Sequence, residues 1–166
     1  MGDGGTSSMI MLVTALVISS ISSVVLINSW SGIADVIEEQ GRKAEADSAT
    51  DVSLAGDTTN VGYVTGTSRI TLYFQNTGTT TLDKDKTDMA IYVAGVAVSI
   101  TGTPAVVSGA AEWYEGELLE VVGTHTGTAH ANDDEVMISL TVRSHPINGV
   151  IGGDTLNEVV RLDVAP

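Results

Sequence analysis

The sequence contains no cysteine, so it can form neither a disulfide framework nor a thiolate metal site. Basic residues are scarce: seven Lys and Arg stand against 21 Asp and Glu, and the formal net charge is -14. A protein that binds nucleic acid needs clustered Lys and Arg to neutralise phosphates, so this composition excludes that class of partner. An acidic surface suits a soluble domain in a salty exterior.

Motifs for catalysis are also missing. The chain has no Gly-x-Ser-x-Gly elbow for a nucleophilic serine and no Gly-x-x-x-x-Gly-Lys loop for a phosphate. We therefore expect no enzymatic activity, no cofactor and no small-molecule substrate. The sequence also lacks an Asn-x-Ser/Thr acceptor for N-glycosylation.

Charge is missing altogether from one long stretch, because no ionisable side chain lies between Asp3 and Asp35. Its apolar part, Met9–Ile27, has about the length needed to cross the hydrocarbon part of a bilayer as a helix, and it contains no Pro or Gly. A cleavable signal peptide fits poorly, because residues 1–5 carry no Lys or Arg. The stretch is typical of a membrane anchor or of the hydrophobic stem of a filament subunit.

The helical pattern continues beyond the apolar run. Glu38 with Arg42, and Glu39 with Lys43, form i,i+4 pairs in the favourable order, so one helix is predicted to end near Asp47. Arg42 and Lys43 are also the basic residues nearest to the apolar run. Taken alone, the positive-inside rule would place the following domain in the cytoplasm.

Small residues recur every four positions within the run, at Ala15, Ser19 and Ser23. Such a row lets a second helix approach closely, and its hydroxyls can form hydrogen bonds across the contact. The alternative is that each Ser donates to the carbonyl four residues earlier in its own helix. The first interpretation predicts self-assembly, as a homo-oligomer or filament, through the N-terminal helix.

The rest of the chain is rich in Thr, Val, Ile and Gly and alternates with period two, for example in Arg69–Gln75. We expect three parts: the helix at 1–47, a linker at 48–60 and a β-domain at 61–166. Six to eight short strands predict a mainly β fold, namely an antiparallel, immunoglobulin-like β-sandwich on a hydrophobic helical stem.

The last strand is expected at about Glu158 to Val164. The Gly-rich segment before it, Ile147–Asp154, is predicted to be a loop.

Two loops contain residues that could bind a metal ion. His125 and His130 precede a run of three acidic residues, while Asp83, Asp85 and Asp88 are spaced somewhat like a calcium loop. Neither pattern completes a known motif, and polar turns explain both, so we predict no metal site.

Paired aromatic residues offer a different kind of site. Trp113 and Tyr114 are adjacent and could contact a partner, since aromatic side chains dominate binding hot spots. Packing within a half-buried strand explains the same pair. Trp30, at the end of the apolar run, fits the aromatic belt of a membrane interface.

Three stretches together resemble the FlaG and FlaF proteins of the archaellum, the archaeal flagellum, and FlaG more closely. They are the stem from Thr6 to Gln40, the strand and Asn-Thr-Gly turn from Ile70 to Asp83, and the segment from Glu112 to Val121. The resemblance implies a membrane-anchored stator subunit whose β-sandwich lies outside the cell, beneath the surface layer. There it would assemble with other archaellum or surface-layer proteins and couple the motor to the envelope.

An archaellin or archaeal type IV pilin, the subunit of an extracellular filament, is the main alternative. Precursors of that kind are cut after a basic residue followed by Gly, whereas Gly2 here follows Met1. Archaellins are also often glycosylated, and this sequence offers no acceptor. A third, different class is a metal-binding module built on the loop from His125 to Glu135.

Overall fold

The computed structural model describes residues 4–126 and 130–165. The chain divides into two compact units, Met1–Gly41 and Arg42–Pro166. The described residues of the first unit are helical, and the second unit holds the end of that helix together with all of the described β-strands.

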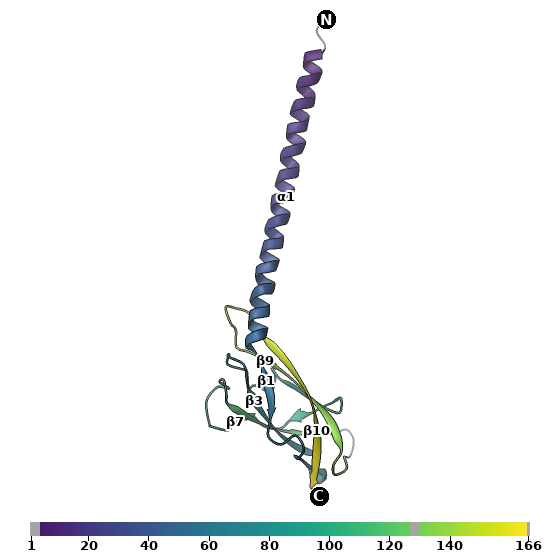
Figure 1. Cartoon of the computed structure of the whole chain (residues 1–166), viewed down its shortest axis with the longest axis vertical. Helices are drawn as coiled ribbons and strands as arrows, with labels where there is room; N and C mark the ends of the chain where they lie inside the picture. The colour runs from purple at the N-terminus through teal and green to yellow at the C-terminus, as the bar shows by residue number, and fades with distance from the viewer. Residues whose placement is uncertain (1–3, 127–129, 166) are drawn as a thin grey trace. The chain divides into compact units, whose positions relative to one another are not determined.

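Helix α1 runs from Gly4 to Ala49 and is the purple-to-blue helix of Figure 1. It ends two residues after the predicted end near Asp47. Its 46 residues correspond to about 70 Å at 1.5 Å per residue. By length and composition, it is apolar enough to cross a membrane.

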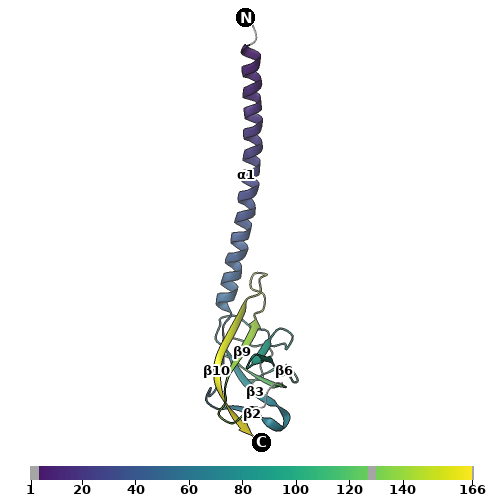
Figure 2. The same cartoon turned by 90° about the vertical axis from the view of Figure 1, so that its right-hand side faces the viewer.

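The described part of the β-domain contains ten strands, two of which, β9 and β10, lie side by side in both views (Figures 1 and 2). The strands are β1 (Val52–Ala55), β2 (Val61–Val64), β3 (Arg69–Asn76), β4 (Ala90–Val93), β5 (Val96–Ala97), β6 (Ser99–Ile100), β7 (Ala105–Val106), β8 (Leu118–Thr124), β9 (Glu135–Arg143) and β10 (Gly153–Ala165), with a 3-10 turn at Thr65–Thr67.

The strands form one curled sheet in the order β5-β4-β9-β10-β2-β3-β8-β6, while β1 pairs with β3 and β7 with β8. The first nine residues of β10 pair with β9, and Leu162–Ala165 pair with β2. Strand β10 therefore belongs to both halves of the curled sheet.

The core lies between these halves and consists of the side chains at every second position of the strands. In β9 the residues at even positions, from Val136 to Val142, are buried and their neighbours are not. Strand β3 buries Ile70, Leu72 and Phe74 in the same way, and both sets belong to one hydrophobic cluster. This pattern is the one expected of strands with one face against a core.

The predicted fold class, one long N-terminal helix followed by a mainly β-domain of sandwich type, is confirmed. A tight hairpin joins β4 and β5: Val93 pairs with Val96, and Ala94 and Gly95 both have positive φ, as a two-residue turn requires.

Some details differ from the antiparallel arrangement that was expected. Strands β2 and β10 are parallel, and β10 begins at Gly153, before the predicted Glu158. A tight turn at Ile147–Val150 precedes it. The stretch expected to be a linker, 48–60, holds the end of α1 and strand β1, whereas the division of the chain into domains at 47 and 60 stays a prediction.

Candidate assembly site

Between residues 4 and 34, helix α1 carries no charged side chain. The large apolar side chains from Met9 to Ile37 are between 51% and 75% exposed within this chain. A helix that is hydrophobic all round is stable only when lipid or other protein surrounds it. In the first unit, Met1–Gly41, the described residues offer no such cover, so it must come from outside this unit.

The predicted row of small residues, Ala15, Ser19 and Ser23, lies exposed on α1. In the single chain Ser23 Oγ donates to the Ser19 carbonyl oxygen at 2.9 Å, and Ser20 and Ser22 donate in the same way to the carbonyls four residues earlier. The hydroxyls are thus satisfied within the helix. A contact between helices along this row stays a prediction.

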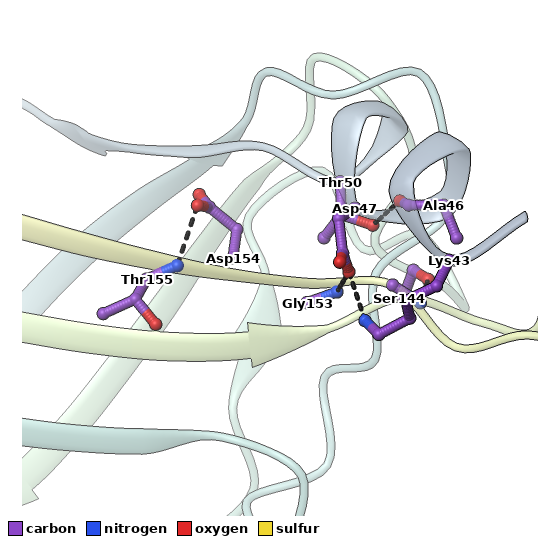
Figure 3. A network of polar contacts seen from close by, with 9 residues as sticks. Lys43, Ala46, Asp47, Thr50, Ser144, Gly153, Asp154 and Thr155 are labelled. Atoms are coloured by element: carbon purple, nitrogen blue, oxygen red, sulfur yellow. Dashed lines mark hydrogen bonds and ion pairs between the residues drawn. The ribbon is translucent and has the colours of Figure 1, made fainter. Parts of the chain in front are cut away.

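The end of α1 is fixed to the β-domain by a polar network within the second unit (Figure 3). Asp47 Oδ1 accepts a hydrogen bond from the Gly153 N–H at 2.8 Å and another from Lys43 Nζ. The Lys43 hydrogen bond first, and then the Gly153 N–H, lower the pKa of Asp47. The ionised carboxylate therefore links the last helical turns to the start of β10.

A second carboxylate continues this network along β10. Asp154 Oδ2 accepts from the Val52 N–H at 3.1 Å, which connects β10 to β1 directly after the helix. Thr50, buried, donates from Oγ1 to the Ala46 carbonyl oxygen at 2.8 Å (Figure 3). The segment that leaves the helix is thus bound to the last helical turn at Thr50 and to β10 at Val52.

Close backbone packing at the same place depends on Gly152. A Cβ atom there would overlap the Ala46 carbonyl oxygen and Thr50 Oγ1. Only glycine allows the strand to approach the helix end so closely.

The Asn-Thr-Gly turn closes the helix from the other side. The Thr79 N–H donates to the Ala49 carbonyl oxygen at 3.0 Å, and the Gly78 N–H donates to the Asp51 carbonyl oxygen at 3.0 Å. These bonds satisfy carbonyls at and just beyond the end of α1 that have no partner within the helix. A Cβ at Gly78 would meet Ala49 and Asp51 backbone atoms.

Asn76 holds this turn in place. It is fully buried, its Nδ2 donates to the Thr80 and Trp113 carbonyl oxygens at 2.8 and 3.0 Å, and its Oδ1 accepts from the Gly78 N–H. The turn predicted from the sequence is therefore also a structural support for the helix end.

The two aromatic residues proposed as a partner contact have different places. Trp113 is fully buried and its Nε1 donates to the Glu117 carbonyl oxygen at 2.9 Å, so the idea that its ring contacts a partner is wrong and the packing alternative holds for it. Tyr114 is exposed at the surface, and its role as a contact stays a prediction.

The three aspartates proposed as a calcium-like loop have local partners. Asp83 Oδ1 accepts from the Asp85 N–H at 2.9 Å, Asp85 Oδ1 accepts from the Thr87 N–H at 3.0 Å, and Asp88 pairs with Arg143 at 3.6 Å. The Thr87 N–H and hydroxyl lower the pKa of Asp85. These carboxylates stabilise a turn, while the expected absence of a metal site here stays a prediction.

The two histidines are buried and stacked, with ring centroids 5.1 Å apart and an interplanar angle of 28°. Tyr63 packs edge-on against His130, and Asp134 Oδ2 lies 3.9 Å from His130 Nδ1. Within residues 4–126 and 130–165, no group of three or more His, Asp or Glu side chains is arranged to hold a metal ion. The other part of this predicted loop, residues 127–129, lies outside the described residues.

The comparison with protein families shows the family of the chain. The model of the archaeal-type flagellins matches residues 2–155. The chain belongs to this family. Archaeal-type flagellins are structural, non-enzymatic proteins of the archaellum, so the chain is a structural archaellum component. The match includes the apolar helix, the Asn-Thr-Gly turn and the network at the helix end.

Other comparisons add little about this archaeal-type flagellin. No curated protein matches it. Among solved structures, it is similar to the crystal structure of the periplasmic chaperone SfaE, with 14% identity and a TM-score of 0.27. That alignment covers 70% of this chain and 57% of the chaperone, and its TM-score is too low to support an argument.

Several residues of the polar network at the end of α1 had no signal in the sequence. The side chain of Asp47 contacts a backbone group 106 positions away, and Asp154 contacts one 102 positions away. Gly152 and Gly153 belong to the segment that the sequence predicts to be a loop. A glycine pair directly before a long strand is the one feature that could have indicated a close backbone approach.

Proposed function

We propose that this chain is a filament subunit, an archaellin, whose N-terminal helix packs among the helices of sister subunits. Membership of the archaeal-type flagellin family supports this at least as well as a stator role. The family match alone does not separate the two roles.

The extent of the exposed apolar surface favours the filament. It reaches from Met9 to Ile37, about 43 Å along the helix axis. The hydrocarbon core of a bilayer is about 30 Å thick, so lipid would leave part of this surface in a polar environment. A core of neighbouring helices can cover the whole length.

Within such a core, the row of Ala15, Ser19 and Ser23 would be the place of closest approach between helices. Before assembly, the same helix would hold the subunit in the membrane, with the acidic β-domain outside the cell. A membrane-anchored state and an extracellular filament are then two stages of one protein.

Immunogold electron microscopy on archaeal cells that produce the full chain tests this proposal. We expect antibodies against the β-domain to label long external filaments along their length, and mass spectrometry of sheared filaments to identify this chain as the main component. Label confined to the cell envelope, with filaments built of other chains, would contradict the filament role and support a stator.

A further inference from the structure

One face of the β-domain differs from the rest of its surface. It consists of the outward positions of β4, β9 and the first part of β10, here called the β4–β9–β10 outer face. Its apolar side chains Tyr92, Met137 and Val159 are exposed, the last two by 50% and 60%. Met137 and Val159 are directly paired across β9 and β10, and Tyr92 lies on the next strand, opposite Ser139.

The face carries an unusual balance of charge. In these fully described strands its charged side chains are Glu135, Arg143 and Arg161, while Glu158 lies on the other side of β10. Removing that one Glu from the 21 acidic residues of the chain, and the two Arg from the seven basic ones, leaves 20 acidic and five basic residues elsewhere. Asp88, just before β4, pairs with Arg143 at 3.6 Å, so the face is close to neutral on a strongly negative molecule.

Its polar side chains are already paired with each other. Ser139 Oγ donates to Asn157 Oδ1 at 2.7 Å, and the hydroxyls of Thr141 and Thr155 lie 3.2 Å apart. Arg161 and Glu135 form an ion pair at 3.2 Å. Burying polar groups that keep such partners costs much less than burying free ones.

These observations indicate what the face can bind. Copies of a chain with a net charge of -14 repel one another, so two β-domains can approach only where at least one of them is not acidic. A nearly neutral face with an exposed apolar centre meets this condition, because it can contact an acidic surface without repulsion.

We propose that the β4–β9–β10 outer face binds an acidic surface of a second copy of this chain. Two different surfaces then meet, and such a heterologous contact continues from subunit to subunit into a helical assembly instead of closing as a dimer. The inference rests on the proposed filament role and adds to it a contact between β-domains, separate from the packing of the helices.

The test compares the full chain with single variants, purified in detergent and assembled by detergent removal. Val159→Glu adds negative charge at the centre of the face and should reduce the sedimented filament fraction by about tenfold or more. Val159→Lys should retain assembly within about threefold, because the facing surface is acidic. Val107→Glu is the control: Val107 is also exposed, by 56%, but lies after β7, outside the face.

Each outcome distinguishes the inference from the function on which it rests. Equal assembly of Val159→Glu and Val107→Glu, or equal loss in Val159→Lys and Val159→Glu, would overturn the inference while leaving the filament role intact. A wild-type chain that forms no filaments would overturn both. Should Val159→Glu alter the near-UV circular dichroism of the domain, Met137→Glu repeats the test on the neighbouring strand.

Discussion

Among single residues, the stacked histidines show how burial determines chemistry. Burial first, and the neighbouring His130 second, lower the pKa of His125, although the Val93 main chain partly opposes the shift. No described residue lies in hydrogen-bonding geometry to either of its ring nitrogens. His125 is therefore neutral at pH 7 and part of the core.

This shift predicts a loss of stability in mild acid. Below about pH 6.5, the ordinary value, the unfolded chain binds a proton at His125 while the folded chain does not. Stability is thus complete above pH 6.5 and falls as the pH is lowered, by at most about 1.4 kcal/mol per pH unit from this group. Urea unfolding of the detergent-solubilised chain between pH 7.5 and 5 measures the slope.

One variant separates the buried histidine from other titrating groups. His125→Phe should flatten the slope between pH 6.5 and 5, because the new side chain cannot bind a proton. An unaltered slope in His125→Phe would show that the acid sensitivity arises elsewhere.

Asn76 shows what the sequence revealed about a residue and what it did not. Asn-Thr-Gly after an alternating strand predicts a turn, and a turn is present. Its second role, supporting the end of α1, involves a helix that ends 27 positions earlier, at Ala49. No local propensity encodes such a contact.

On the scale of elements, the close packing of Gly152, just before β10, against the end of α1 is expected to be important for stability. Gly152→Ala would push its Cβ into the Ala46 carbonyl, which is backbone and cannot rotate away. We expect the free energy of unfolding to fall by about 1–3 kcal/mol. Trypsin should also cut faster after Arg42 and Lys43, because the helix end is released more often.

Gly62→Ala provides the matched control in strand β2. A Cβ at Gly62 meets open space, so stability should change by no more than about 0.5 kcal/mol. If both variants behaved alike, the close contact between β10 and the helix end would not be important for stability.

The elements themselves were predictable to different degrees. An uncharged run defines α1, and alternation defines β3 and β9, because both signals are local. Strand β10 was expected to start later, since Gly153 and Asp154 resemble loop residues. Its parallel pairing with β2 joins segments about 100 positions apart, and nothing in either segment specifies that partner.

For the whole molecule, the strongest constraint on assembly is charge. Subunits with a net charge of -14 repel one another when packed into a filament, and salt screens this repulsion. The Debye length falls from about 30 Å at 0.01 M to about 3 Å at 1 M. We expect the temperature at which filaments dissociate to rise with NaCl concentration over this range, as followed by light scattering.

Sucrose at matched osmolality serves as the control, because it screens no charge. A dissociation temperature that stays constant or falls with NaCl would contradict the view that repulsion between acidic domains limits assembly.

The position of β10 has a consequence for how the chain matures. It is the last described strand, yet it lies between β9 and β2 and completes both halves of the curled sheet. During synthesis, α1 and the other described strands emerge first, and β9 and β2 present open edges until β10 arrives. The helix can therefore enter the membrane well before the domain closes, and the unfinished domain must be kept from pairing with its neighbours during that interval.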